Sequence, residues 1–397
     1  MISERVLTME ESATLAMAAK SRELKEQGHD VISLSLGEPD FKTPDHIREG
    51  AKEAIDEGKY FAYPPVPGYK DLREAIAAKL RNENNINEAT ADHILVSNGA
   101  KQSIANVMFA LINPGDEVII FAPYWVSYSA LVKLPGGKPV FVSGTIENDF
   151  KVTAEQVEAA ITPRTKAILY SSPCNPTGAV FSQDELTAIA EVVKKHENIV
   201  VLADEIYEHI NYVGKNASIG AVPGMFERTC TINGFAKGFA MTGWRVGYIC
   251  APIWLVKACN KIQGQITSAN CSIAQRAALT ALTSDLGPTL AMTEAYNKRR
   301  TLVYDLLTKI PGLKVNMPEG AFYFFPDVSS YFGKTAGDTT INNASDLCLY
   351  LLAKAHVALV DGGAFGEPNC IRLSYAASED ELKEAASRMT KALAALS

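Results

Sequence analysis

A single lysine, Lys237, lies in a stretch of small and apolar residues at 232–245 (INGFAKGFAMTGWR), which ends in Arg245. Apolar surroundings disfavour the ammonium form of a lysine, so the neutral amine becomes accessible. A neutral amine can form a Schiff base with a carbonyl. Arg245, two helical turns later, is placed to hold a phosphate on the same molecule. Alternatively, Lys237 is a surface lysine with an unrelated arginine nearby.

Pyridoxal 5'-phosphate (PLP) is one small molecule that offers both groups, an aldehyde for Lys237 and a phosphate for Arg245. Asp204 suits the same cofactor, because it follows the apolar run 199–202 (IVVL) at the carboxyl end of a predicted strand. A buried carboxylate needs a cation or hydrogen-bond donors. The protonated pyridine nitrogen of PLP is such a cation, and an acid beside it keeps the ring able to accept electrons. The alternative is that Asp204 caps a following helix.

Two loops that follow predicted strands could hold the rest of the cofactor. Residues 96–102 (VSNGAKQ) predict a strand end, a tight turn and a helix start, whose free N–H groups and positive dipole end suit a phosphate. Residues 171–178 (SSPCNPTG) contain two prolines and a glycine, which would present Asn175 rigidly to the phenolic oxygen of the cofactor. Each segment also has a simpler interpretation, as an ordinary turn.

Arg372 lies inside an apolar, strand-like run at 370–374 (CIRLS). A guanidinium in such a place needs an anion, and a substrate carboxylate can accept two parallel hydrogen bonds from it. An internal salt bridge is the competing interpretation.

The composition is that of an ordinary globular protein, with 47% hydrophobic and 21% charged residues among 397. A formal net charge of -7 and the lack of a Lys/Arg cluster argue against nucleic acid as a partner. No apolar run has the length of a signal peptide or a membrane span. The seven scattered cysteines lack a CxxC pair, and the six histidines lack HxxxH and HExxH patterns. We therefore expect reduced thiols, a cytoplasmic location, no membrane partner and no metal site.

Short apolar runs alternate with amphipathic helical patterns between about residues 90 and 285. The runs are continuous in hydrophobicity, which is typical of strands covered on both faces. This alternation predicts an α/β fold, in which a mostly parallel sheet lies between helices and ligands bind at the carboxyl ends of the strands. The runs include 94–96, 117–121, 139–142, 167–170, 199–202 and 245–249.

The rest of the chain predicts a second, smaller α+β domain. The N-terminal helix, at about 12–27, could pack with either domain. We expect a large PLP-binding domain at 36–285, and a small domain made of 1–35 and 286–397. The predicted elements of the C-terminal part are a helix at about 289–307, strand-like pieces at 321–325 and 370–374, and a closing helix from about 379.

In their joint order, these segments resemble the PLP-dependent aminotransferases of class I and fold type I, the aspartate aminotransferase family. The resemblance covers almost the whole chain. It implies the fold described above, with the large domain built on the mostly parallel sheet and the small domain of α+β type. Matching stretches are SAT at 12–14, LGEPDF at 36–41, YPPVPG at 63–68, PYWVSY at 123–128 and the strand that carries Arg372.

The resemblance implies a role for each residue that would contact the cofactor. Lys237 would bind the cofactor aldehyde and shuttle a proton, while Asp204 binds the pyridine nitrogen. Tyr207 and Asn175 would hydrogen-bond the phenolic oxygen, and Trp125 would stack on the ring. This chemistry is general acid–base catalysis with the cofactor as electron sink. The groups implied at the phosphate are Arg245, the N–H groups of Ala100 and Lys101, and Tyr63 from a neighbouring subunit.

Tyr63 in that role implies a homodimer with shared active sites. Gly234 is a departure from the family pattern, because many relatives have a phosphate-binding serine there. We expect this departure to remove one hydrogen bond and to weaken cofactor retention only modestly. The family pattern also implies that Arg372 binds the substrate α-carboxylate. Its helpers would be Asn175, Trp125 and the backbone of Gly37.

One branch of the family holds the distal carboxylate of its substrate with a threonine and a lysine, and Thr14 and Lys101 match both positions. A lysine in the first turn of a helix opposes the helix dipole, which hints at an anionic partner. The alternative is a solvated lysine. We hypothesise amino-group transfer between L-aspartate and 2-oxoglutarate, giving oxaloacetate and L-glutamate. Prephenate, or a broader set of substrates, is the alternative on the same site.

Other functions fit part of the same pattern. A PLP-dependent C–S lyase, or a carbon–carbon bond-forming enzyme, would use Lys237, Asp204 and Arg245 equally well, but has no need of Thr14 and Lys101. A binding protein that kept only the fold is disfavoured, because the side chains expected for catalysis are intact: Lys237, Asp204, Tyr207 and Arg372. A nucleotide-binding dehydrogenase is disfavoured, because no GxGxxG follows any predicted strand.

Overall fold

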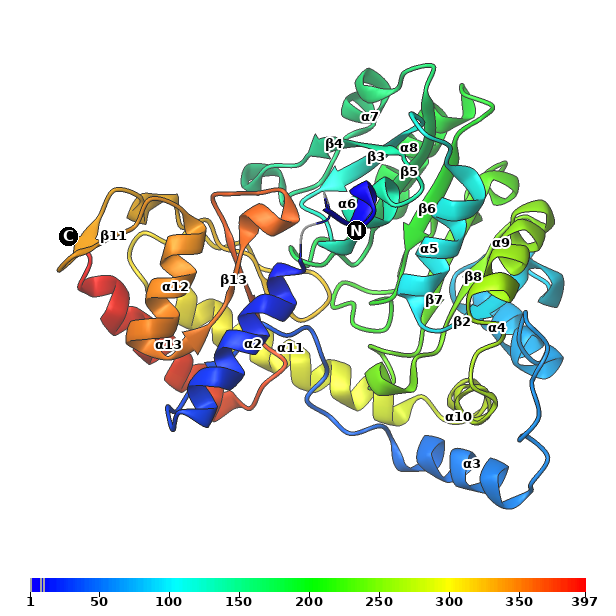
Figure 1. Cartoon of the computed structure of the whole chain (residues 1–397), viewed down its shortest axis with the longest axis horizontal. Helices are drawn as coiled ribbons and strands as arrows, with labels where there is room; N and C mark the ends of the chain where they lie inside the picture. The colour runs from blue at the N-terminus through cyan, green and yellow to red at the C-terminus, as the bar shows by residue number, and fades with distance from the viewer. Residues whose placement is uncertain (1, 8, 10) are drawn as a thin grey trace.

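A seven-stranded sheet forms the centre of the larger part of the molecule, on the right of Figure 1. The structure is a computed structural model that describes residues 2–7, 9 and 11–397. Its strands are β2 (Ile94–Ser97), β3 (Glu117–Ala122), β4 (Lys138–Ser143), β5 (Thr165–Ser171), β6 (Val200–Asp204), β7 (Thr229–Gly234) and β8 (Gly247–Cys250). They lie in the order β2-β8-β7-β6-β5-β3-β4. β8 is antiparallel to both neighbours and the other neighbouring pairs are parallel, so the predicted mostly parallel sheet is confirmed.

Helices cover both faces of this sheet. They are α3 (Asp45–Asp56), α4 (Lys70–Glu83), α5 (Ala100–Leu111), α6 (Ser127–Lys133), α7 (Ala154–Ala160), α8 (Gln183–Lys194), α9 (Ile253–Ile266) and α10 (Ser272–Thr283). In β6, Val200 and Leu202 share a core with α5 and α9, whereas Val201 and Ala203 share a different core with α8. Successive side chains of a strand point to opposite faces, so a strand covered on both sides is apolar at every position.

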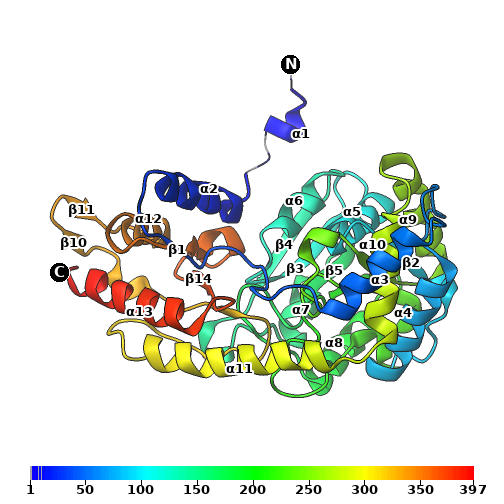
Figure 2. The same cartoon turned by 90° about the horizontal axis from the view of Figure 1, so that it is seen from below.

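The smaller part combines the N-terminal segment with the C-terminal elements, on the left of Figure 1. β1 pairs in parallel with β12, and α2 packs against β12 and β13. β13, β14 and β9 form an antiparallel sheet. The elements are α2 (Ala13–Glu26), β1 (Ile32–Ser33), β9 (Tyr323–Phe324), β10 (Thr335–Ala336), β11 (Thr339–Thr340), α12 (Ala344–Ala355), β12 (Val357–Ala358), β13 (Val360–Asp361), β14 (Ile371–Ser374) and α13 (Glu379–Ala394). The first helix, α1 (Glu4–Leu7), lies apart from these elements in Figure 2.

One long helix, α11 (Gly287–Leu307), runs along both parts of the molecule, as Figure 2 shows. It carries buried residues such as Met292 and Leu307, which pack into the core of the smaller part. Within the described ranges, neither this helix nor any other is long and apolar enough to cross a membrane.

Two features of the sheet differ from the sequence-based expectation. The apolar runs did not include β7, because polar residues such as Thr231 and Asn233 alternate with apolar ones there; both are buried nonetheless. β8 begins at Gly247 rather than at 245. The reason is local, because Arg245 has a left-handed backbone with φ of 58°, which a strand does not accommodate.

Candidate active site

A cavity of about 690 Å³ lies at the carboxyl ends of the parallel strands. Asp204 ends β6, Ser171 ends β5, and Lys237 follows β7. Arg372 of β14 and Tyr323 of β9 line the same cavity from the smaller part of the molecule. This edge of the sheet is where ligands bind in open α/β folds.

The predicted site residues come together in this cavity, apart from Tyr63. Tyr63 lies in the loop between α3 and α4 and is 97% exposed. The predicted residues that line the cavity are Thr14, Gly37, Ala100, Lys101, Trp125, Asn175, Asp204, Tyr207, Lys237, Arg245 and Arg372.

The amine of Lys237 donates a hydrogen bond to the carbonyl oxygen of Gly37. Burial is the main cause that lowers the pKa of this amine to about 8. The charge of Glu38 opposes the shift, whereas the charges of Arg372 and Arg245 reinforce it. A lysine with this pKa is partly neutral near pH 7.5, so its amine can act as a base or a nucleophile.

Asp204 is 4% exposed, and burial raises its pKa to about 6. One carboxylate oxygen accepts a hydrogen bond from the hydroxyl of Tyr128 at 2.6 Å, and the other accepts one from the backbone N–H of Ile206 at 3.2 Å. Both hydrogen bonds act against the effect of burial on the pKa of Asp204. A turn rather than an α-helix follows β6, so Asp204 bonds a turn N–H but caps no α-helix.

Tyr207 and Tyr323 meet hydroxyl to hydroxyl at 2.7 Å, across the boundary between the two parts. Burial, and then the neighbouring Tyr323, raise the pKa of Tyr207 well above its usual value. A Cβ placed on Gly37 would lie 2.1 Å from the hydroxyl of Tyr323. A side chain at position 37 would therefore displace the hydroxyl of Tyr323, which fills the space beside Gly37.

Arg372 is buried in β14 and lies between the rings of Tyr323 and Phe365, 4.6 and 4.8 Å from their centroids. Its guanidinium donates to Asn175 Oδ1 at 2.9 Å and to the carbonyl oxygen of Ser35 at 2.6 Å, while Nε has no partner. No acidic side chain in the described part of the chain lies within 4.0 Å of it. The internal salt bridge considered from the sequence is therefore not formed.

Arg245 lies beside the amino end of α5. Its guanidinium donates to the carbonyl oxygens of Thr242 at 2.9 Å and Asn98 at 3.3 Å. A Cβ on Gly99 would lie 2.4 Å from the guanidinium, so glycine lets the arginine approach the start of the helix. The first N–H groups of α5, on Ala100 and Lys101, have no partner within the helix. An arginine next to such N–H groups forms an anion site.

Gly234, the departure noted in the sequence, ends β7 where this strand approaches β8 closely. A Cβ there would lie 2.8 Å from both Gly247 Cα and the carbonyl oxygen of Val246. Contacts below 3.0 Å to backbone atoms require the backbone to shift. The close pairing of the two strands therefore explains why position 234 carries no side chain.

Lys101 and Thr14 line the cavity from α5 and α2. The ammonium group of Lys101 lies 4.8 Å from the ring centroid of Trp125. Burial, and then the positive charge of Arg245, lower the pKa of Lys101. Among the described side chains, no carboxylate lies within 4.0 Å of this ammonium group. Lys101 is thus a further cation in the cavity, beside Arg372 and Arg245, that has no acidic partner among the described residues.

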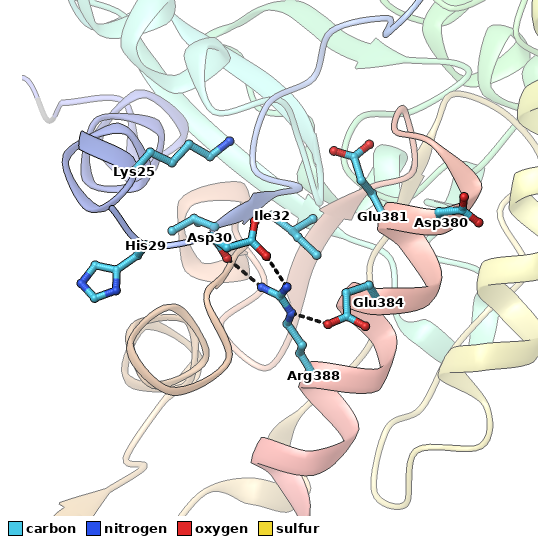
Figure 3. A pocket seen from close by; sticks show the side chains of 9 residues that line it. Lys25, His29, Asp30, Ile32, Asp380, Glu381, Glu384 and Arg388 are labelled. Carbon is cyan, nitrogen blue, oxygen red and sulfur yellow. Dashed lines mark hydrogen bonds and ion pairs between the residues drawn. The ribbon is translucent and has the colours of Figure 1, made fainter. Parts of the chain in front are cut away.

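A second cavity, of about 480 Å³, lies between α2 and α13 (Figure 3). Arg388 occupies its centre and donates to the carbonyl oxygen and the carboxylate of Asp30, and to Glu384 at 2.8 Å. These bonds tie the segment that follows α2 to α13. Within the described residues, no group of three or more His, Cys, Asp or Glu could hold a metal ion.

Sequence reasoning missed the aromatic residues that hold the predicted ones in place. Tyr128 follows Trp125 by one helical turn, and that spacing could have indicated a shared face. Tyr323 lies in a predicted strand piece, but nothing local connects it with Tyr207. Phe365 and Ser35 likewise contact Arg372 only through the fold.

Comparisons with known proteins agree with this geometry. The model of the family described as "Aminotransferase class I and II" matches residues 29–389. An aspartate/prephenate aminotransferase of Cereibacter sphaeroides is 44% identical over 100% of this chain and 99% of its own. A bifunctional aspartate aminotransferase and glutamate/aspartate-prephenate aminotransferase of Petunia hybrida is 46% identical over 99% of this chain and 82% of its own.

Solved structures give the same result. The aspartate aminotransferase of Rhizobium meliloti superposes with a TM-score of 0.96, at 42% identity over 100% of both chains. The aspartate aminotransferase of Thermus thermophilus with maleate superposes with a TM-score of 0.93, at 42% identity over 99% of both chains. The chain therefore belongs to the class I and II aminotransferases, and the resemblance and the fold class drawn from the sequence are confirmed.

Proposed function

We propose that this chain is a PLP-dependent aspartate aminotransferase, which moves the amino group between L-aspartate and 2-oxoglutarate. The observation that carries the proposal is a pair of cations, Arg372 and Lys101, that line one cavity with Lys237 and lack an acidic partner. Two uncompensated cations suit a substrate with two carboxylates.

The residues of the cavity fit PLP. Arg245 and the N–H groups of Ala100 and Lys101 would hold the phosphate, in a cradle that the absent side chain of Gly99 leaves open. Asp204, held by Tyr128, would pair with the pyridine nitrogen. The remaining contacts that we propose are a hydrogen bond from Tyr207, another from Asn175, and stacking on Trp125.

When bound, PLP supplies an electron sink for the carbanion that forms at the substrate Cα. Lys237 Nζ would take the proton from the substrate Cα and would later return it to the cofactor carbon bonded to the transferred nitrogen. Its pKa of about 8 suits both steps near neutral pH. The hydroxyl of Tyr207, which contacts that of Tyr323, would donate to the phenolic oxygen of the cofactor.

For the substrate, we propose that Arg372 binds the α-carboxylate with the help of Asn175 and Gly37, whereas Lys101 and Thr14 bind the distal carboxylate. The Thermus thermophilus neighbour was solved with maleate, which is a dicarboxylate, and this supports a site for two carboxylates. Prephenate is a second candidate substrate, since relatives that are 44% and 46% identical are named for it.

We further propose that the chain acts as a homodimer in which Tyr63 completes the phosphate site of the neighbouring subunit. The nearly complete exposure of Tyr63, beside Phe61 at 71%, supports a surface that a second copy covers. A hollow of about 840 Å³ next to Arg245, lined by Phe41 and Trp244 among others, offers room for a segment of that copy.

The division into a domain at 36–285 and a domain made of 1–35 and 286–397 is also our proposal. Separate apolar cores on the two sides of the cavity support it. A cytoplasmic location is proposed from the cysteines, all seven of which are free thiols.

The proposal is tested by a single-turnover titration of the PLP-loaded protein. L-aspartate, L-glutamate, L-alanine, L-phenylalanine and L-cysteine are added separately without an oxo acid, and the cofactor absorbance is followed. We expect the two dicarboxylic amino acids to convert the cofactor to pyridoxamine phosphate. Reaction with none of them would refute the transaminase. Reaction with cysteine alone and release of pyruvate would refute it in favour of a lyase. Prephenate and oxaloacetate in the reverse half-reaction then rank the substrates.

A further inference from the structure

A group of buried polar side chains lies behind the segment that carries Asp204 and Tyr207. Glu205 and Glu208 each follow one of these two site residues in the sequence. Neither glutamate lines the active-site cavity, so their side chains leave the backbone on the other side. Glu205 is 1% exposed and Glu208 is 9% exposed. Two carboxyl groups buried side by side need an explanation, because burial disfavours their charged forms.

The partners of the two glutamates come from α4 and from one serine. Lys79 forms an ion pair with Glu208 and donates to Asn84 Oδ1 at 2.8 Å. Asn84 Nδ2 donates to Glu208 Oε2 at 2.8 Å and to Glu205 Oε2 at 3.0 Å. The hydroxyl of Ser218 lies 2.6 Å from Glu205 Oε1. Asn84 thus links both carboxyl groups to a single ammonium group.

The geometry gives the two carboxyl groups different charges. Glu208 is paired with the ammonium group of Lys79. Burial acts to raise the pKa of Glu208, but the charge of Lys79 helps to bring that pKa below its usual value. Glu205 has only neutral direct partners, and burial together with the charge of Glu208 raises its pKa to about 8. At neutral pH the group therefore contains one ion pair and one protonated acid. His209 and Glu83 lie at its edge, with the His209 ring 4.0 Å from Glu208 and 3.2 Å from Glu83.

The same segment is fixed through its backbone at only a few points. The N–H of Glu205 donates to the carbonyl oxygen of Ile232 in β7 at 2.8 Å, and the N–H of Glu208 donates to that of Glu205 at 2.9 Å. After Glu205, the turn is held by the N–H of Ile210, which donates to the carbonyl oxygen of Tyr207 at 2.7 Å, by the contact of Tyr207 with Tyr323, and by the side chain of Glu208. The ion pair with Lys79 holds that side chain from α4, 129 positions away in the sequence.

We propose that Lys79, Asn84 and Glu208 position the turn at 204–208, and so hold Asp204 and Tyr207 in the orientation that the reaction requires. This inference rests on the proposed aminotransferase function. Glu208 is a positioning residue, since its side chain does not line the cavity and acts through the two residues that do.

The test compares two identical chemical changes three positions apart, E208Q and E205Q, in the PLP-loaded protein. E208Q removes the buried counter-ion of Lys79 and leaves only the more exposed Glu83, 3.7 Å away. We therefore expect kcat for L-aspartate to fall about 10- to 100-fold, the effect of a small misplacement of reacting groups. We expect KM to change less than about threefold, because Arg372 and Lys101 are untouched. The absorbance and circular dichroism bands of bound PLP should also shift, because the cofactor contacts move.

E205Q should change kcat at least about fivefold less than E208Q. Glutamine is neutral, as Glu205 is at pH 7, and it keeps an oxygen for Asn84 and an N–H donor for Ser218. E117Q is the matched control for lost stability. Glu117 is also buried and paired, with Arg164 at 2.6 Å, but it begins β3 at the end of the strand remote from the cavity. This control should lower stability and leave kcat and the PLP spectrum unchanged.

The double variant K79M/E208L keeps the test decisive if E208Q folds poorly. Replacing a whole buried ion pair by apolar residues is often neutral for stability. We expect this variant to fold and to keep a lowered kcat and a shifted PLP spectrum. Wild-type kcat and an unchanged spectrum in a folded double variant would overturn the positioning role. A wild-type protein that does not bind PLP or react with L-aspartate would instead overturn the proposed function.

Discussion

Two buried cations flank the turn that carries Asp204 and Tyr207, and the chain compensates only one of them. Lys79, behind the turn, is 6% exposed and is paired with Glu208. Arg372, on the cavity side, is 1% exposed and has amide and carbonyl partners only. A buried ion without a counter-charge costs stability. The comparison teaches that a cation compensated within the chain serves the fold, whereas one left uncompensated marks where an anionic ligand binds.

The largest effect is expected when Arg372, the uncompensated cation, is removed. For R372L we expect kcat/KM for L-aspartate to fall about 100- to 1,000-fold, because the substrate carboxylate loses a buried charged partner. Stability should fall by about 1 kcal/mol, because Asn175 Oδ1 and the carbonyl oxygen of Ser35 lose a donor but no acid is left unpaired. Steady-state kinetics and urea unfolding check both parts.

A matched control for this variant is R276L. Arg276 is another arginine with little exposure, but it is bonded to both oxygens of Asp71 at 2.6 and 2.7 Å. We expect R276L to lose about 1 to 2 kcal/mol, since a charge-assisted pair is broken. A larger loss of stability in R372L than in R276L would contradict the distinction drawn here.

Removing Lys79, the compensated cation, should lower stability and leave the binding of substrate nearly unchanged. K79M leaves Glu208 buried without a counter-charge, so the free energy of unfolding should fall by about 3 kcal/mol. KM for L-aspartate should change little, because neither substrate carboxylate contacts Lys79. Urea unfolding monitored by circular dichroism gives the first value, and a loss below about 1 kcal/mol would show that Lys79 is not needed to compensate Glu208.

The pH dependence of stability sharpens the contrast between the two glutamates. Glu205 has its pKa raised to about 8 in the folded chain, against 4.5 as its ordinary value. Between these values the folded chain holds a proton that the unfolded chain has lost, so this group favours folding at low pH and loses that contribution as the pH rises to 8. E205Q should therefore gain stability relative to wild type from pH 5.5 to pH 8, by about 1 kcal/mol per pH unit.

Unfolding titrations of both proteins at three pH values measure this difference. If the two proteins keep a constant difference across the range, Glu205 is ionised in the fold and the assignment of its charge is wrong.

The smallest effect is expected at the distal carboxylate. K101A should raise KM for L-aspartate about tenfold, the loss of one charge-assisted hydrogen bond. KM for L-alanine and for L-phenylalanine should change far less, because neither has a second carboxylate. K101R keeps the charge and is the control. Equal losses for all three amino acids would refute Lys101 as the distal-carboxylate ligand.

The elements that the sequence predicted best are those with a local signal. The apolar strands, Lys237 in its apolar stretch and Arg372 within a strand each carry their information within a few residues. The contacts that orient them do not. Tyr128 reaches Asp204 across 76 positions and Tyr207 meets Tyr323 across 116, and such pairs leave no local pattern.

Lys79 shows the same limit in another way. In the sequence it is one lysine on an amphipathic helix, where lysines usually face solvent. Only the packing of α4 against the turn after β6 reveals that it is buried and paired. The burial of a charged side chain is decided by which elements meet, and a single sequence does not state that.

The contact between β7 and β8 at Gly234 has a consequence for engineering. A serine at this position is an obvious graft for tighter cofactor retention, copied from relatives that bind the phosphate through a hydroxyl there. In this chain, the Cβ of such a serine would collide with the backbone of Gly247 and Val246. Improvements in retention therefore have to be sought on the opposite wall, around the start of α5, or in the subunit contact that we propose for Tyr63.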